Sequence, residues 1–411
     1  MAELSTGGGV RDAAPVSTPA SVRDLARIGL ALVVLLLVLV GAHLLFDSRD
    51  YGARASFSLL IGAALGFVFQ RGRFCFFCIL RDFIEDRNST GLFAILAALA
   101  VGGIGYAVVF GAFLPNSFSG RLPPDAHIGP VSWVLAAAGV AFGLGMALSG
   151  ACISGHLYRL GEGYTRAPFA LIGSLVGFGL GFFTWQSVYL SAIRAAPVAW
   201  LPGTAGYGGA LTIHLAALTA IGLVLLRWLP ARDPTPAERV TPATIHRALF
   251  GGRWNPLATG ALVGVIGVAA YFRVEPLGVT SQLGSVSRTV LDNAGLLADR
   301  LNGLDGFAGC ATVVVQAITE NGWLIGGLAL ASFAAALLSK RFSISRLTLR
   351  GTITALGGGV LMGWGSMLAL GCTVGTLLSG ISAFALSGWV FAAAMFAGVF
   401  VGVKLKLHRL D

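Results

Sequence analysis

The sequence predicts an all-α polytopic membrane protein made of two inverted structural repeats, with broken short helices that meet near the bilayer midplane. The first observation is the composition: 56% of the residues are hydrophobic, 11% are charged and 58 are glycine, a balance typical of membrane proteins. The second is a glycine-rich motif with one cysteine at 143–155, which returns at 363–375 with its cysteine 220 residues later. Such half-length repetition is typical of repeats whose discontinuous helices face each other.

Membrane-spanning helices are predicted from apolar runs, since about 20 helical residues cross roughly 30 Å of hydrocarbon. In the first half these runs lie near 27–46, 53–70, 91–114, 131–148, 168–189 and 209–228. In the second half they lie near 256–272, 322–339, 351–370 and 386–405, with shorter segments around 276–286, 288–300 and 304–319. They divide the chain into a flexible cytoplasmic tail at 1–26, a first repeat with an extra N-terminal span at 27–228, a cytoplasmic linker at 229–255 and a second repeat at 256–411.

Basic residues cluster in the short segments between these runs, so the net charge of +10 needs no nucleic-acid partner. By the positive-inside rule, the tail, the linker, the loop at 340–350 and the C-terminus face the cytoplasm. The segment that ends at Cys152 is then expected to enter the bilayer from the cytoplasmic side, and the segment that ends at Cys372 from the outer side. Opposite directions are what an inverted repeat requires.

Cys152 and Cys372 are the strongest functional candidates because glycine, which lowers helix propensity, breaks the helix around each of them. The flanking glycines are Gly150, Gly155, Gly371 and Gly375. Unpaired backbone at membrane depth must be enclosed by protein or line a water-filled path, where helix N-termini offer amide donors to an anion. The alternative is that these small residues only permit close helix packing.

Two further thiols form a Cys-Phe-Phe-Cys pair. Through a fainter repeat Cys75 aligns with Ser287, whereas Cys78 is interpreted as apolar filling, since free cysteine often behaves as a small buried hydrophobe. A single pair without further ligands does not predict a metal site, and no cofactor is expected.

Cys310 follows a glycine but has no counterpart in the first half, so a functional and a packing interpretation stay equally open. His156 follows the break at Cys152 and is expected to line an inner vestibule. Arg273 and Arg288 lie towards the outer side and are candidates for an electrostatic funnel that attracts anions.

Three motifs together resemble the YeeE/YedE family of bacterial inner-membrane sulfur transporters. They are Arg71-Gly72-Arg73-Phe74-Cys75, Leu148-Ser149-Gly150-Ala151-Cys152 and Leu370-Gly371-Cys372-Thr373-Val374-Gly375. The resemblance implies an hourglass-like helical fold and import of thiosulfate, or a related reduced-sulfur anion, by transient thiol–sulfur contacts along a path lined by Cys75, Cys152 and Cys372. It also implies a cytoplasmic TusA-like sulfur carrier as partner. Relatives linked to selenium and other sulfur species leave the substrate open.

Two other functions use the same residues. A membrane thiol redox relay or sulfurtransferase would use Cys75 and Cys78 as a dithiol, with Cys152 and Cys372 as resolving thiols. A scaffold would bind a cytoplasmic carrier and move nothing. The sequence contains no nucleotide-binding P-loop, so direct ATP drive is not encoded in this chain.

Overall fold

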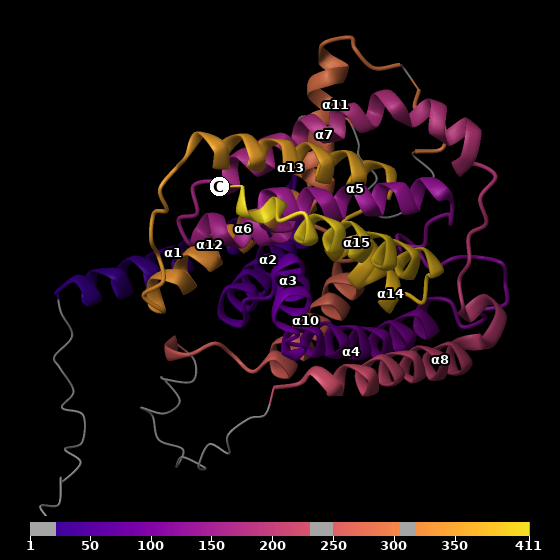
Figure 1. Ribbon diagram of the computed structural model, residues 1–411, viewed down its shortest axis with the longest axis horizontal. Helices are drawn as coiled ribbons and strands as arrows, with labels where there is room; N and C mark the ends of the chain where they lie inside the picture. Colours follow the sequence, from indigo (N-terminus) through magenta and orange to yellow (C-terminus); the bar gives the residue numbers. More distant parts are fainter. Residues whose placement is uncertain (1–21, 231–249, 299, 305–313, 315–316, 411) are drawn as a thin grey trace, which may run out of the picture.

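The computed structural model describes residues 22–230, 250–298, 300–304, 314 and 317–410, and these ranges form helices joined by turns, with two isolated β-bridges (Figure 1). The long helices are α1 (Val22–Asp47), α2 (Gly52–Gly72), α4 (Thr90–Phe113), α5 (Trp133–Ser149), α7 (Ala167–Val188), α8 (Pro202–Leu225), α10 (Pro256–Arg273), α12 (Glu320–Leu338), α13 (Leu349–Leu368) and α15 (Leu386–Lys404). All ten coincide within a few residues with predicted spans, so the predicted all-helical class is confirmed.

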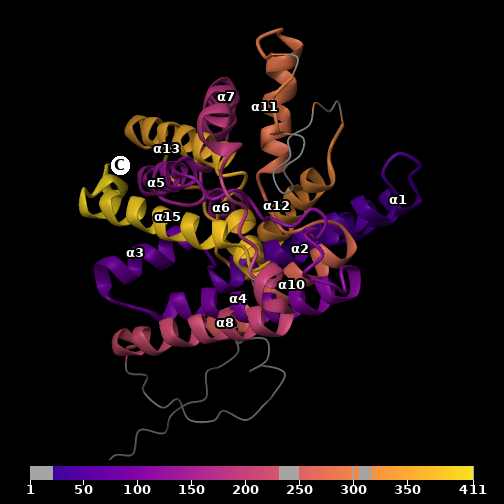
Figure 2. The ribbon, with the colours of Figure 1, turned by 90° about the vertical axis from the view of Figure 1, so that its right-hand side faces the viewer.

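The shorter elements are α3 (Phe76–Asp86), α6 (Ile153–Gly161), η1 (Tyr189–Ile193), η2 (Leu226–Trp228), α11 (Ser281–Asn293), η5 (Thr373–Ser379), α14 (Gly380–Ser382) and η6 (Leu407–Arg409). The segments predicted near 276–286 and 288–300 are one helix, α11, which stands beside α7 (Figure 2). Most of the segment predicted near 304–319 lies outside the described residues.

Length and composition identify nine helical stretches among the described residues that are able to cross a membrane. A tenth candidate joins Leu349–Leu368 to Thr373–Ser382 with a bend of 44°. This bend falls at Cys372, where the sequence predicts a broken helix.

The two halves pack through helix pairs that exchange partners. α2 packs along α12 and α4 along α10, while α5 packs along α15 and α7 along α13. If α2, α4, α5 and α7 correspond to α10, α12, α13 and α15, every pairing has its counterpart. This exchange is the pattern that two halves related by a pseudo-twofold axis, as in the predicted inverted repeat, would give.

A reciprocal glycine contact lies where α5 crosses α13. A methyl group at Gly145 would lie 2.6 Å from the carbonyl oxygen of Gly358, and one at Gly358 would lie 2.6 Å from the carbonyl oxygen of Gly145. Only glycine permits backbones to approach this closely. The crossing brings the ends of α5 and α13 into one core, and Cys152 and Cys372 follow those ends.

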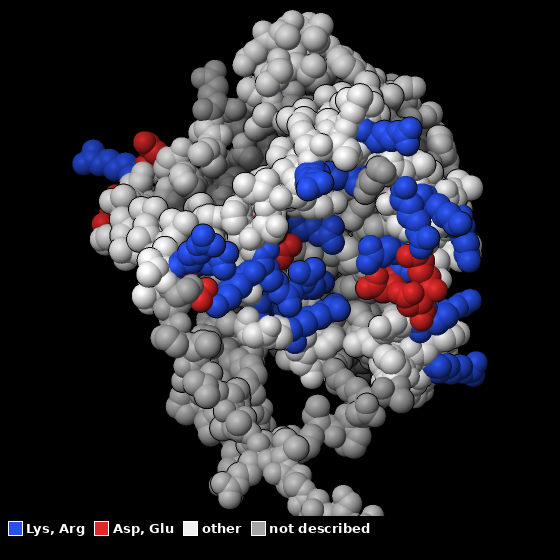
Figure 3. Space-filling view, turned by 60° about the vertical axis from the view of Figure 1, so that its left-hand side comes forward, with Lys and Arg blue, Asp and Glu red and all other residues white. Residues whose placement is uncertain are grey.

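One end of the molecule gathers the start of α1 and the segments next to the linker. There Lys340 pairs with Asp24 at 2.8 Å, the Ser89 amide donates to the Trp228 carbonyl, and the Trp254 amide donates to the Arg71 carbonyl. We call this the linker end. Figure 3 looks towards it and shows more Lys and Arg than Asp and Glu side chains on this face.

The opposite end joins the other set of loops. Pro130 and Val198 form one β-bridge there and Trp200 and Ala385 the other, and Arg54 lies 3.6 Å from Glu320. We call this the far end.

The two broken segments run in opposite directions, as the sequence predicts. Three crossing segments (α1, α2 with α3, and α4) precede α5, so α5 begins at the far end and leads to Cys152 from there. α13 begins after Lys340 at the linker end and leads to Cys372 from that end. The side of the membrane from which each segment enters depends on the orientation of the protein and stays a prediction.

Candidate functional site

Three cysteines occupy the same local structure. Cys75, Cys152 and Cys372 are each the N-cap residue, with extended backbone, of the helical segments α3, α6 and η5. Two residues before each cysteine the chain adopts a left-handed conformation, with φ of 53° at Arg73, 84° at Gly150 and 54° at Leu370. The repeated motif is thus a helix end, a left-handed residue, one spacer residue and a cysteine that starts the next helical segment.

Cys75 and Cys152 meet across the first turn of α6. A methyl group at Gly155 would lie 2.9 Å from Cys75 Sγ and 3.4 Å from Cys152 Sγ, so both thiols lie against the bare Cα of Gly155. The two thiols are in hydrogen-bonding contact. Cys152 Sγ also accepts from the Gly155 amide at 3.4 Å and lies 3.2 Å from Ser154 Oγ.

The helix start at α3 also reaches this thiol pair. The backbone of Phe76, the first residue of α3, lies within hydrogen-bonding reach of Cys152. Backbone donors from two helix N-termini therefore meet at the sulfur of Cys152, an arrangement suited to negative charge.

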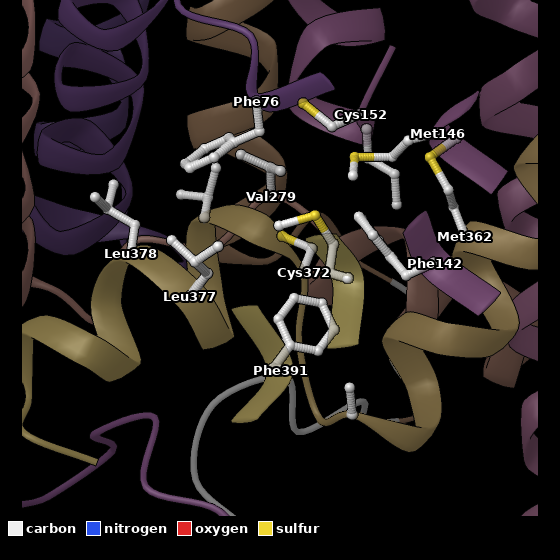
Figure 4. Close-up of a cluster of buried hydrophobic side chains, with 14 of the residues drawn as sticks. Phe76, Phe142, Met146, Cys152, Val279, Met362, Cys372, Leu377, Leu378 and Phe391 are labelled. Atoms are coloured by element: carbon white, nitrogen blue, oxygen red, sulfur yellow. The ribbon is translucent and has the colours of Figure 1, made fainter. Parts of the chain in front are cut away.

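Cys372 lies in the same hydrophobic cluster as the thiol pair. Figure 4 shows Cys152 and Cys372 among buried apolar side chains that include Phe76, Met146 and Val279. The side chains of Cys75, Cys152 and Cys372 all have 0% exposure, so an ion reaches them only after neighbouring apolar groups move.

Cys78 has a polar partner that the sequence did not reveal. Arg159 Nη2 donates to Cys78 Sγ at 2.9 Å, and Arg159 Nη1 donates to the Gly150 carbonyl oxygen at 3.3 Å. Cys78 is half-buried, and Cys75 is in hydrogen-bonding contact with it. Cys78 packs against the hydrophobic core, as its interpretation as apolar filling expects, but its sulfur also accepts from a guanidinium.

His127 is a second residue that sequence reasoning missed. A methyl group at Gly375 would lie 2.9 Å from its Cε1 atom, so the imidazole lies against the first turn of η5. Burial lowers the pKa of His127 to about 4, although a hydrogen bond with the backbone of Leu370 opposes this. The imidazole is therefore neutral at physiological pH. Its loop position, between α4 and α5, gave no periodic signal in the sequence.

The remaining predicted residues are not gathered at the thiols. Ser287 lies inside α11 and donates to the Leu175 carbonyl oxygen at 2.8 Å, whereas Thr280 is the residue that precedes α11 as Cys75 precedes α3. The alignment of Cys75 with Ser287 is therefore off by seven residues. His156 is fully buried in α6 and is not open to solvent in this conformation.

Arg273 is exposed in the last turn of α10 and lies over the Phe57 ring at 4.9 Å, and Arg288 lies within α11. Cys310 lies outside the described residues. Among the residues that the structure describes, no three His, Cys, Asp or Glu side chains lie close enough together to hold a metal ion.

The chain thus combines several helices able to cross a membrane with buried thiols, and sequence comparison identifies its family. The profile of the family described as "Sulphur transport" matches residues 71–401, which is most of the chain. The chain therefore belongs to this family and is a multi-pass membrane protein.

Relatives with assigned names cover most of the chain. The thiosulfate transporter TsuA of Escherichia coli (strain K12) is 30% identical over 365 residues, which are 85% of this chain and 94% of TsuA. The protein of the same name from Spirochaeta thermophila is 27% identical over 344 residues, 81% of this chain and 93% of its own length. The probable transporter YedE of Escherichia coli (strain K12) is 34% identical over 173 residues, 42% of this chain and 40% of its own.

Proposed function

We propose that this protein imports thiosulfate, or a related reduced-sulfur anion, across the bacterial inner membrane along a path formed by Cys372, Cys152 and Cys75. The observation that carries the proposal is that three cysteines start three helical segments with the same local structure and share one buried cluster. The similarity to two proteins named thiosulfate transporter supports the choice of substrate.

The chemistry of the thiols suits this substrate. A hydrated dianion enters an apolar waist only where donors replace its water, and thiols and helix amides are such donors. Thiols donate weakly, which favours release as well as binding, as conduction requires. The terminal sulfur of thiosulfate offers a soft acceptor that sulfate lacks.

The order of contacts follows from the two ends of the molecule. The basic linker end would face the cytoplasm by the positive-inside rule, and with it the N-terminal tail and the C-terminus. From Cys372, η5 and α14 continue to the far end, where Ala385 pairs with Trp200. From Cys152, α6 continues to the linker end, where Gln70 bonds Glu162 and Ser339. An ion from outside would meet Cys372 first and then the pair of Cys152 and Cys75.

Uptake of labelled thiosulfate into vesicles that contain only this protein tests the proposal. We expect uptake by the wild type, weak competition by sulfate, and at least about tenfold slower uptake for Cys152→Ala, since each 1.4 kcal/mol of added barrier is tenfold in rate. Abundance in the membrane must be matched. Normal uptake by Cys152→Ala would refute the central role of this thiol, and equal competition by sulfate would refute the soft-sulfur selectivity.

A thiol-exchange relay is the second candidate, because Cys75 contacts both Cys78 and Cys152. Cys152→Ser separates the two, since a hydroxyl still donates a hydrogen bond but forms no sulfur–sulfur bond. A permease with non-covalent contacts should keep a measurable part of its uptake in Cys152→Ser. Complete loss in this variant, together with substrate sulfur trapped on the wild-type protein, would favour the relay.

A cluster of arginines at the linker end supports docking of a TusA-like sulfur carrier. Arg73 lies 4.0 Å from Glu162, and Arg253 donates to the Gly72 carbonyl oxygen. Burial lowers the pKa of Arg341, and the positive charge of Arg73 adds to this. Positive charge thus exceeds negative charge here, as an acidic partner would require. Binding of the carrier should weaken with rising salt and with Arg73→Glu; binding that both leave unchanged would refute this docking site.

A further inference from the structure

Arg159 lies one step beyond the thiol pair on the way to the linker end. It belongs to α6, seven residues after Cys152, and its guanidinium folds back to bond the sulfur of Cys78 and the carbonyl oxygen of Gly150. The aromatic rings of Tyr158 and Tyr164 flank it at 6.0 and 5.6 Å from their centroids. These contacts fix the position of the positive charge.

Two carboxylates that lie close in sequence to Cys78 and Arg159 have other partners. Asp82 pairs with Arg81 at 2.7 Å, and Glu162 accepts from Gln70 at 3.1 Å and lies 4.0 Å from Arg73. Within the described residues Arg159 forms no ion pair of its own. No acid in the described part of the chain therefore neutralises its positive charge, which stays available to an anion.

Accessibility increases from the thiol pair towards Arg159. Cys75 and Cys152 are fully buried, whereas Cys78 and Arg159 are half-buried. Cys78 lies one helical turn after Cys75 on α3. The Cys78 and Arg159 pair thus lies between the closed thiol pair and the solvent at the linker end.

We propose that Cys78 and Arg159 form an anion-binding site at the cytoplasmic exit of the path, in which Arg159 binds the sulfonate oxygens of thiosulfate and Cys78 contacts its terminal sulfur. This proposal rests on the proposed transport function and adds a fourth binding position to the path, after Cys75. Two parallel N–H donors of a guanidinium match two oxygens of such an anion. A thiol beside the guanidinium matches the sulfur end, so the site contacts both the oxygens and the terminal sulfur of one ion.

The position of this site also explains how the ion would leave the waist. A fixed positive charge on the exit side attracts an anion more strongly than the weak thiol donors in the apolar constriction do, so the anion moves towards the exit. The bonds of Arg159 to Cys78 and Gly150 compete with the anion and prevent tight trapping.

Alkylation of Cys78 in the purified protein tests the site without relying on transport. The protein is treated with a maleimide at increasing concentrations of thiosulfate or sulfate. Peptide fragmentation then distinguishes modification of Cys78 from modification of Cys75. We expect thiosulfate to slow alkylation of Cys78 in the wild type and sulfate to do so less. In Arg159→Gln the same protection should need about tenfold more thiosulfate, as expected for loss of charged hydrogen bonds. The matched control is Arg81→Gln, which removes a positive charge from α3 that is already paired with Asp82 and should retain protection.

Variants and uptake measurements keep the test decisive. If Arg159→Gln does not fold, Arg159→Lys keeps the positive charge but lacks the two parallel N–H donors. It should still weaken the protection of Cys78 by thiosulfate and raise the KM for uptake. Absence of protection in the wild type, or equal protection in both Arg159 variants and the wild type, would overturn the exit site. Absence of thiosulfate uptake by wild-type vesicles would instead overturn the proposed function, and the alkylation result would stand separately.

Discussion

Cysteine is not among the residues that cap helices well, since serine, threonine, asparagine and aspartate are preferred. Cys75, Cys152 and Cys372 nevertheless start three helical segments, and only Cys152 has a side-chain cap bond, a 3.4 Å contact from the Gly155 amide. A hydroxyl would satisfy these helix starts better. The presence of sulfur at all three positions therefore favours a role in substrate contact over a role in stability.

The pH dependence of stability tests whether burial keeps the imidazole of His127, which lies against η5, neutral. With a pKa near 4 in the folded protein and about 6.5 in the unfolded chain, only the unfolded state takes up this proton between these values. The free energy of unfolding should therefore fall as pH decreases from about 6.5 to 4. In His127→Gln this contribution is absent, so its melting temperature should fall less over the same range than that of the wild type. If the melting temperatures of the two proteins in detergent fall equally with pH, the imidazole of His127 is not held neutral by burial.

The helix breaks at Cys152 and Cys372 were predictable because glycines within an apolar run can be recognised from the sequence alone and the motif occurs twice. The pairing of Cys78 with Arg159 was not, because it joins two helices 81 residues apart. Ser287 was misplaced since residues 280–287 carry no cysteine to fix the register, and the helix start at Thr280 became visible only in the structure.

At the scale of elements, the short helix α6 is the part whose position determines the site. Its first turn carries Gly155 against both thiols, its middle carries the buried His156, and its last turn carries Arg159. Long apolar helices were predictable from composition, whereas α6 and α3 were not, because each is shorter than a span and follows directly after one. Their direction depends on the left-handed residues at Gly150 and Arg73.

Gly155→Ala separates helix stability from site geometry. Alanine favours a helix by roughly 0.5–1 kcal/mol over glycine, so α6 should form at least as well. The new methyl group would lie 2.9 Å from Cys75 Sγ, and this contact should displace the thiol. We expect normal abundance in the membrane and about tenfold slower thiosulfate uptake, equivalent to about 1.4 kcal/mol of barrier.

Gly326→Ala is the control for this substitution, because it also lies within a helix but has nothing within 4 Å of the added methyl group. It should retain wild-type uptake. If Gly155→Ala transports as well as Gly326→Ala, close contact of the two thiols across α6 is not needed for passage.

At the scale of the whole molecule, the charges and the helix directions agree with each other. The linker end combines the start of α1, the segments beside the linker and the end of α15, and among its charged side chains Lys and Arg exceed Asp and Glu (Figure 3). The far end joins the loops at 114–132, 189–201 and 383–385. The number of crossings places these two sets of loops on opposite sides of a membrane.

The basic linker end predicts that this end faces the cytoplasm, and direct measurement can test this direction. In vesicles of native orientation, a cysteine introduced in the linker by Ala237→Cys should be shielded from an impermeant maleimide added outside. A cysteine introduced in the exposed loop of the far end by Ser119→Cys should react with it. The native thiols at the waist are buried, and the unmodified protein measures their background. Permeabilisation should make Ala237→Cys reactive. Reaction of Ala237→Cys in intact vesicles, with Ser119→Cys shielded, would reverse the orientation and with it the order in which the substrate meets Cys372, Cys152 and Cys75.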